Sequence, residues 1–152
     1  MIRTDLQTFR QTHKGGNVTG VIYLELHDGA FPETGWSDFP VIILGWWADA
    51  LLQLEESNRR KVQWSFMDGP QSVTLIKMAT GSTDAFDLFH VHSSLLEVTE
   101  NVIAHCDQHA MATNDLEALR VRIGLLKANK TLVATGDNVL LEFELPFRRC
   151  HS

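Results

Sequence analysis

The sequence predicts a single α+β domain over residues 1–152, with a mainly antiparallel sheet. Three observations support this. Residues suited to strands and helices follow one another as strand, helix, three strands, two helices and strand, without the regular alternation of a parallel sheet. The composition, 44% hydrophobic and 21% charged, is that of a globular protein. No repeat, low-complexity tract or interdomain linker divides the chain.

The first strand is expected at Val18–His27, which is rich in β-branched and apolar residues. A break at Gly15-Gly16 precedes this segment, and the Asp28-Gly29 turn closes it. The residues before Gly15 are mostly polar and are assigned to no element.

The first helix is expected over Asp38–Glu55, with Ser37 as its N-cap and Asp38 and Pro40 in its first turn. Apolar side chains fall on almost every side of this helix. A helix of this kind is usually covered all round by its own protein, so Trp46 and Trp47 are both predicted to lie in the core. The alternative is a helix face covered by another subunit.

A hairpin is predicted where Val62, Trp64 and Phe66 alternate with polar residues, followed by the Asp68-Gly69-Pro70 turn and a strand at Ser72–Met78. The loop Thr80–Asp84 then leads to a further strand at Ala85–Val91. The economical arrangement is a meander of three neighbouring antiparallel strands.

Two amphipathic helices are predicted next. Ser93 or Ser94 would cap the first, which extends to Ala110, and Asn114 would begin the second, which ends near Ala128. Both are expected to cover one face of the sheet. Thr131–Leu145 is predicted to form a closing strand or hairpin.

The charge and cysteine content restrict the possible partners and the compartment. The formal net charge of −6 argues against nucleic acid or an anionic membrane as the partner. Cys106 and Cys150 have no spacing that indicates a disulfide framework, and no secretory signal is recognised at the N-terminus. The apolar stretch Phe39–Leu54 is too short to span a membrane, so a reducing, cytoplasmic location is expected.

Four histidines form the best candidate metal site. His90 and His92 would lie on one side of the predicted strand, and His105 and His109 are one helical turn apart. The segment between the latter pair lacks the general-base glutamate of zinc proteases. The alternative is that all four are structural, buried or bordering solvent.

No catalytic or cofactor motif accompanies these histidines. The chain has no Gly-x-Ser-x-Gly elbow and no phosphate-binding glycine loop, and Cys106 falls within a helix pattern where an inert thiol is expected. The sequence therefore predicts no catalytic residue and no cofactor.

The loop between the first strand and the first helix is the candidate partner-binding surface. It contributes two aromatic and two acidic residues, and the hairpin turn adds a third acid; the predicted contacts are Phe31, Glu33, Trp36, Asp38 and Asp68. Each also has a structural explanation. Asp28 and Asp68 precede glycine in turns, Asp38 suits a helix dipole, and Trp36 can pack on the first helical turn.

The segments FPETGWSDFPVIILGWW at 31–47 and FMDGP at 66–70 resemble small uncharacterised bacterial proteins of about this length, some of which act as immunity proteins beside toxins. The resemblance implies a cytoplasmic binding protein without a cofactor. It identifies no toxin and transfers no site residue.

Three hypotheses about function follow. The leading one is a protein-binding module that neutralises a toxin by direct binding. The second is a metal-binding protein or enzyme that uses the four histidines. The third is a homo-oligomeric structural module.

Overall fold

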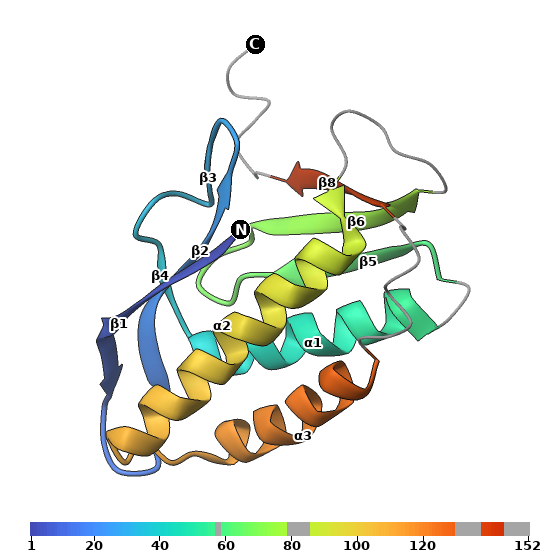
Figure 1. The fold of residues 1–152 in the computed structure, drawn as a ribbon. Coiled ribbons are helices and arrows are strands. Elements are labelled where there is room, and N and C mark those ends of the chain that lie inside the picture. The colour runs from blue at the N-terminus through green and yellow to red at the C-terminus, as the bar shows by residue number, and fades with distance from the viewer. Residues whose placement is uncertain (57–58, 79–85, 130–137, 145–152) are drawn as a thin grey trace.

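The computed structural model describes residues 1–56, 59–78, 86–129 and 138–144. The described part contains three helices and two antiparallel four-stranded sheets, which confirms the predicted α+β class (Figure 1). The predicted loop at Thr80–Asp84 and Cys150 lie outside the described residues, as do residues 131–137 and 145 of the strand or hairpin predicted at Thr131–Leu145. No described helix is long and apolar enough to cross a membrane.

The first sheet contains β1 (Ile2–Gln11), β2 (Val18–Leu26), β3 (Gly29–Phe31) and β4 (Ser37–Asp38). The strand predicted at Val18–His27 is confirmed as β2, which pairs with β1, β3 and β4. The assignment of the N-terminal residues to no element was wrong. In β1 the buried side chains of Ile2 and Phe9 are separated by a register shift between Asp5 and Arg10, which interrupts the simple alternation.

The second sheet has the order β5-β6-β8-β7. The predicted hairpin is confirmed by β5 (Lys61–Ser65) and β6 (Ser72–Met78), and β8 (Asn138–Glu144) is the predicted closing strand. The meander was wrong, because β8 takes the place beside β6. The third strand expected at Ala85–Val91 is reduced to the two residues of β7 (Phe86–Asp87), which pair with β8.

Helix α1 spans Pro40–Glu56. Ser37 and Asp38 belong instead to β4, where they pair with Val21 and Gly20, so the predicted Ser37 cap was wrong. The main-chain carbonyl of Phe39 accepts the first bonds of the helix, from the amides of Ile42 and Ile43.

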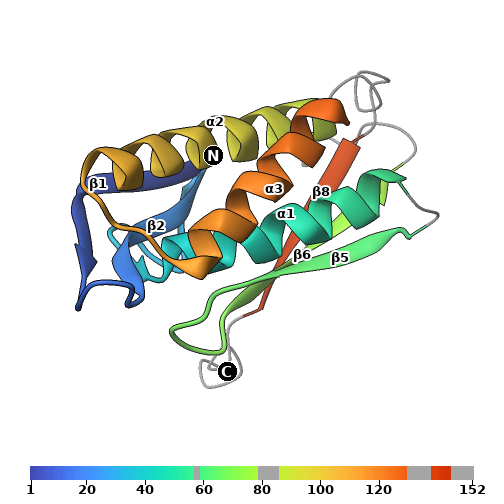
Figure 2. The ribbon, with the colours of Figure 1, turned by 90° about the horizontal axis from the view of Figure 1, so that it is seen from below.

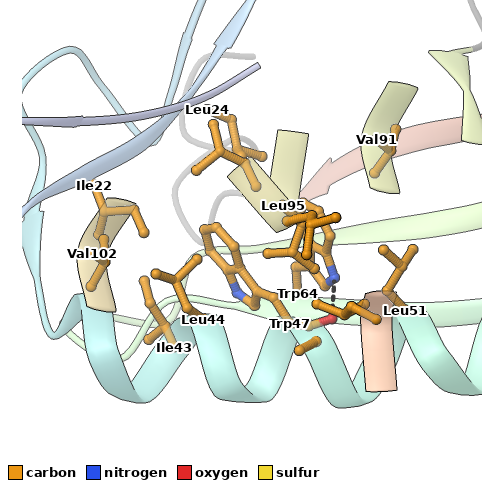
Figure 3. Close-up of a cluster of buried hydrophobic side chains, with 14 of the residues drawn as sticks. Ile22, Leu24, Ile43, Leu44, Trp47, Leu51, Trp64, Val91, Leu95 and Val102 are labelled. Carbon is orange, nitrogen blue, oxygen red and sulfur yellow. Dashed lines mark hydrogen bonds between the residues drawn. The ribbon is translucent and has the colours of Figure 1, made fainter. Parts of the chain in front are cut away.

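The two adjacent tryptophans of α1 have different environments. Trp47 is fully buried, but Trp46 is 46% exposed, so the prediction that both lie in the core was wrong for Trp46. The Trp47 ring stacks on Trp64 of β5 with centroids 4.8 Å apart. The Trp64 indole nitrogen donates to the Trp47 carbonyl at 3.2 Å (Figure 3), and the Trp47 nitrogen donates to the Ser65 carbonyl at 2.9 Å. The indoles are therefore buried with their N–H groups satisfied.

Helix α2 spans Leu88–Gln108 and begins earlier than predicted. The Asp87 side chain accepts from the Phe89 amide and caps the helix, so Ser93 and Ser94 lie inside it. Leu88, Val91 and Leu95 are buried with helical spacing, and tertiary burial thus outweighs the strand propensity of this segment.

Helix α3 spans Asn114–Ala128, close to the prediction, although Thr113 rather than Asn114 is the N-cap, accepting from the Leu116 amide at 2.9 Å. The expectation that α2 and α3 both cover a sheet face was wrong for α3. Figure 2 shows α3 lying against α1 and α2, on the side away from β5 and β6. Helix α2 instead contacts β1 and β7.

Candidate functional site

The carboxylate of Asp38 joins two loops that are far apart in the sequence. Asp38 is 2% exposed. Its oxygens accept hydrogen bonds from the Phe39 amide at 2.8 Å and the Trp36 indole nitrogen at 2.9 Å. They also accept from the amides of Met67 and Asp68, at 3.2 and 3.1 Å. We call Trp36, Asp38, Phe39, Met67 and Asp68 the Asp38 junction.

Local structure places each side of the junction. Pairing of β4 with β2 fixes Asp38 beside Gly20, and the turn from β5 to β6 brings Met67 and Asp68 to the carboxylate. The turn is closed by the bond from the Phe66 amide to the Gln71 carbonyl at 3.1 Å, and Gly69 adopts φ +125°, which favours glycine. The predicted Asp68-Gly69-Pro70 turn is thus the second half of the site.

A cluster of aromatic rings packs against the junction. Phe31 lies 4.8 Å from Phe143 and 5.8 Å from Phe66, measured between ring centroids. The Trp36 ring meets Phe66 edge-on at 6.3 Å. Trp36 therefore packs on the hairpin of the second sheet.

The five predicted partner contacts divide into buried and accessible residues. Phe31 is 5% exposed and Asp38 is almost fully buried, so their prediction as contacts is corrected: both support the loops from inside. Trp36 is partly buried, whereas Glu33 and Asp68 are exposed. Sequence reasoning missed Met67, which is 43% exposed. The signal was the alternation at the end of β5, which turns Phe66 inward and Met67 outward.

The four histidines do not converge. His90 and His92 lie on α2 rather than on a strand, and His105 and His109 lie near the other end of that helix. At about 1.5 Å per residue, His92 and His105 are about 20 Å apart along the axis. Among the described residues no group of three or more His, Cys, Asp or Glu is placed to hold a metal ion. The four-histidine candidate for a metal site is therefore wrong.

His92 belongs to a buried polar cluster that sequence reasoning missed. Its Nδ1 lies 2.7 Å from a Glu55 carboxyl oxygen, and its Nε2 lies 2.9 Å from the Leu126 carbonyl oxygen. The other Glu55 oxygen accepts from the Asn129 side-chain amide at 2.7 Å. The Glu55 and His92 side chains have no exposed surface. We call Glu55, His92 and Asn129 the Glu55 cluster.

The hydrogen bonds define the protons of the Glu55 cluster. A carbonyl oxygen only accepts, so His92 Nε2 carries a hydrogen. The Nδ1–carboxyl contact then holds one further proton, on either the imidazole or the carboxyl group. The cluster ties α1, α2 and α3 together, but its reactive atoms are all sealed from solvent.

The other two helical histidines form a stacked pair. The rings of His105 and His109 have centroids 4.2 Å apart and an interplanar angle of 28°. The rings of Phe9 in β1 and His105 meet edge to face, with their centroids 5.6 Å apart. Burial, together with the charge of His109, lowers the pKa of His105.

Cys106 is buried, and burial raises the pKa of its thiol to about 11. At neutral pH it is a protonated, poor nucleophile, consistent with the inert thiol predicted from the sequence.

Two cavities border α2. One, of about 330 Å³, lies between β1 and α2 and includes Arg3, His90, Ser94 and Glu97 in its lining. The other, of about 390 Å³, lies between α2 and α3 and is bordered by ion pairs from Lys127 to Glu100 and from Arg120 to Asp107. Neither contains a residue of the Asp38 junction or the Glu55 cluster.

A scan against models of protein families finds no match to this chain. Searches of the curated proteins and of the solved structures likewise find no match.

Proposed function

We propose that the protein is a cytoplasmic protein-binding module whose contact surface is the accessible rim of the Asp38 junction. Its contact residues are Trp36, Met67 and Asp68 of the junction, together with the adjacent Glu33, whose main-chain carbonyl accepts from the Trp36 amide at 3.2 Å. The module would act as an immunity-type protein does, by covering the active surface of a toxin. The observation that carries this proposal is the buried Asp38 carboxylate, which holds both loops in one arrangement before any partner arrives.

Preorganisation favours binding because loops that are already ordered lose less conformational entropy in a complex. Here Asp38 bonds the Met67 and Asp68 amides directly, and Phe66 packs beneath Trp36. Aromatic and methionine side chains are enriched in protein interfaces. The two segments that resemble immunity-type proteins, 31–47 and 66–70, also meet at this junction, which supports the same surface.

The charge of this rim suggests the chemistry of the partner. Glu33 and Asp68 are both exposed acids, and the whole chain carries a net charge of −6. Complementary charges steer association and suppress wrong partners. We therefore expect a partner with a basic surface patch.

The test is co-purification with the product of the neighbouring gene, followed by titration calorimetry. Glu33→Lys combined with Asp68→Lys should weaken binding by more than about tenfold, because the new charges face a basic patch. Glu97→Lys combined with Glu100→Lys, an equal change of charge at two exposed residues of α2, is the matched control and should bind within about threefold of wild type at the same salt concentration. The proposal is contradicted if the double variant binds with unchanged affinity. It is also contradicted if the product of the neighbouring gene does not co-purify with the protein.

A homo-oligomeric module is the second candidate function. It is favoured by the exposure of three large apolar side chains on α1 and α3, with Trp46 at 46%, Val121 at 64% and Leu125 at 51%. Light scattering after size-exclusion chromatography distinguishes the two. A dimer that Val121→Lys converts to a monomer favours this second function, and a wild-type monomer excludes it.

A further inference from the structure

We propose that His105 and His109 form a two-imidazole chelate for a divalent transition-metal ion such as zinc, at the C-terminal turn of α2. This site is separate from the proposed protein-binding surface. It also differs from the four-histidine site predicted from the sequence, since His90 and His92 take no part.

The tautomer of His109 leaves a lone pair available. Its Nδ1 lies 2.9 Å from the His105 carbonyl oxygen, which also accepts from the His109 amide at 3.1 Å. A carbonyl cannot donate, so Nδ1 carries the hydrogen and Nε2 of the neutral ring has a free lone pair. A metal-bound histidine usually donates its other ring N–H to a carbonyl or carboxylate, which fixes its orientation. His109 already has that arrangement.

The spacing of the two rings is close to what a chelate requires. Two imidazoles bound to one tetrahedral zinc ion through bonds of about 2.0–2.1 Å have ring centroids about 5 Å apart. The observed centroid separation is 4.2 Å. For both rings to bind one ion, their centroids must move apart by about 1 Å. The His105 ring must also turn out of the stack, in which the ring planes are 28° apart, until one of its nitrogens faces the ion bound by His109 Nε2.

The position at the end of the helix adds a favourable field. His109 is the C-cap of α2, where carbonyl groups give the helix end a partial negative charge. A cation at this place interacts favourably with the helix dipole. Phe9 covers one edge of His105, so the pair is held against β1 on one side and meets solvent on the other.

The described residues place no third His, Cys, Asp or Glu with this pair to form a larger group. Water or a group from another molecule would therefore complete the coordination of the ion. Such a site binds reversibly, unlike the closed four-ligand sites that hold structural zinc.

Titration calorimetry with zinc chloride tests the proposal on the full chain. Because Cys150 and His151 are adjacent in the sequence and could themselves bind zinc, the reference protein carries Cys150→Ser and His151→Gln. It should bind one zinc ion per chain. His109→Gln should weaken this binding by more than about tenfold, since a single imidazole has no chelate partner held nearby.

His90→Gln is the matched control, because it removes an exposed histidine of the same helix. Its zinc affinity should stay within about twofold of the reference protein. His105→Gln should reproduce the His109→Gln effect, and histidine side-chain NMR should show zinc shifting the ring signals of both His105 and His109. Should His105→Gln fail to fold, the exposed His109 variant decides the matter alone. Zinc affinity unchanged in His109→Gln, or no binding up to about 1 mM zinc, overturns the proposal.

Discussion

The described part of the molecule contains two buried carboxylates that are satisfied in different ways. Asp38 accepts three of its four hydrogen bonds from main-chain amides and one from an indole. Glu55 is bonded by the side chains of His92 and Asn129, which lie 37 and 74 residues away in the sequence. Main-chain amides are present whatever the side chains are, so the backbone path of the loops is enough to supply them. Side-chain partners are lost when either of the two residues is substituted. The first arrangement should therefore tolerate neighbouring substitutions better than the second.

The largest effect is expected for His92→Leu. The substitution leaves the buried Glu55 carboxyl without its imidazole partner, and breaking such a pair costs about 3–5 kcal/mol of unfolding free energy. Urea unfolding followed by tryptophan fluorescence measures it. His90→Ala, an exposed histidine two residues earlier on α2, serves as the control and should change stability by less than about 0.5 kcal/mol.

Asp38→Ala should have the next largest effect. It leaves the indole of Trp36 and the amides of Met67 and Asp68 without their acceptor, and we expect a loss of about 2–4 kcal/mol. Water can reach part of the rim and solvate some of these donors, so the loss stays below that of His92→Leu. Asp68→Ala removes an exposed carboxylate from the same turn and should cost less than about 0.5 kcal/mol. Equal losses in the two aspartate variants would refute the role assigned to Asp38.

Asn129→Ala is expected to cost about 1–3 kcal/mol, because it removes one donor from a buried carboxyl oxygen. Since Asn129 and His92 share Glu55 as their acceptor, the two substitutions should not be additive in a double-mutant cycle measured by urea unfolding. Simple additivity would mean that the three side chains do not act as one cluster.

Trp36→Phe should show the smallest effect, about 0.5–1.5 kcal/mol. The change keeps an aromatic ring on Phe66 and removes the indole N–H, so Asp38 retains its three main-chain donors. The comparison of the two carboxylates is contradicted if Trp36→Phe destabilises the protein more than Asn129→Ala in the same urea assay.

The sequence predicted those elements whose own residues determine them. The strand at Val18, the hairpin around Gly69 and the helix from Asn114 carry local signals of alternation, turn chemistry and amphipathicity. The N-terminal strand was missed because its register shift between Asp5 and Arg10 breaks the alternation. The start of α2 was missed because Phe86, Phe89 and Val91 favour a strand locally, and burial against other elements decided otherwise.

The candidate site was predictable in part. The aromatic and acidic residues at 31–38 and the turn at Asp68 were selected from the sequence, but their burial was not. Asp38 is buried because the turn after β5 supplies amides from 29 and 30 residues away. The Glu55 cluster joins the ends of three helices, and no local pattern indicates which of seven histidines would lie there.

The central claim is that the Asp38 carboxylate fixes the two loops as one surface. Amide hydrogen exchange at Met67 and Asp68 tests this claim most directly. Both amides lie in a turn, where exchange is normally fast, but here each donates to Asp38. NMR should find both protected by more than about 100-fold in the wild-type protein and largely unprotected in Asp38→Ala, while β5 and β6 amides stay protected. Fast exchange of Met67 and Asp68 in the wild-type protein would contradict the account.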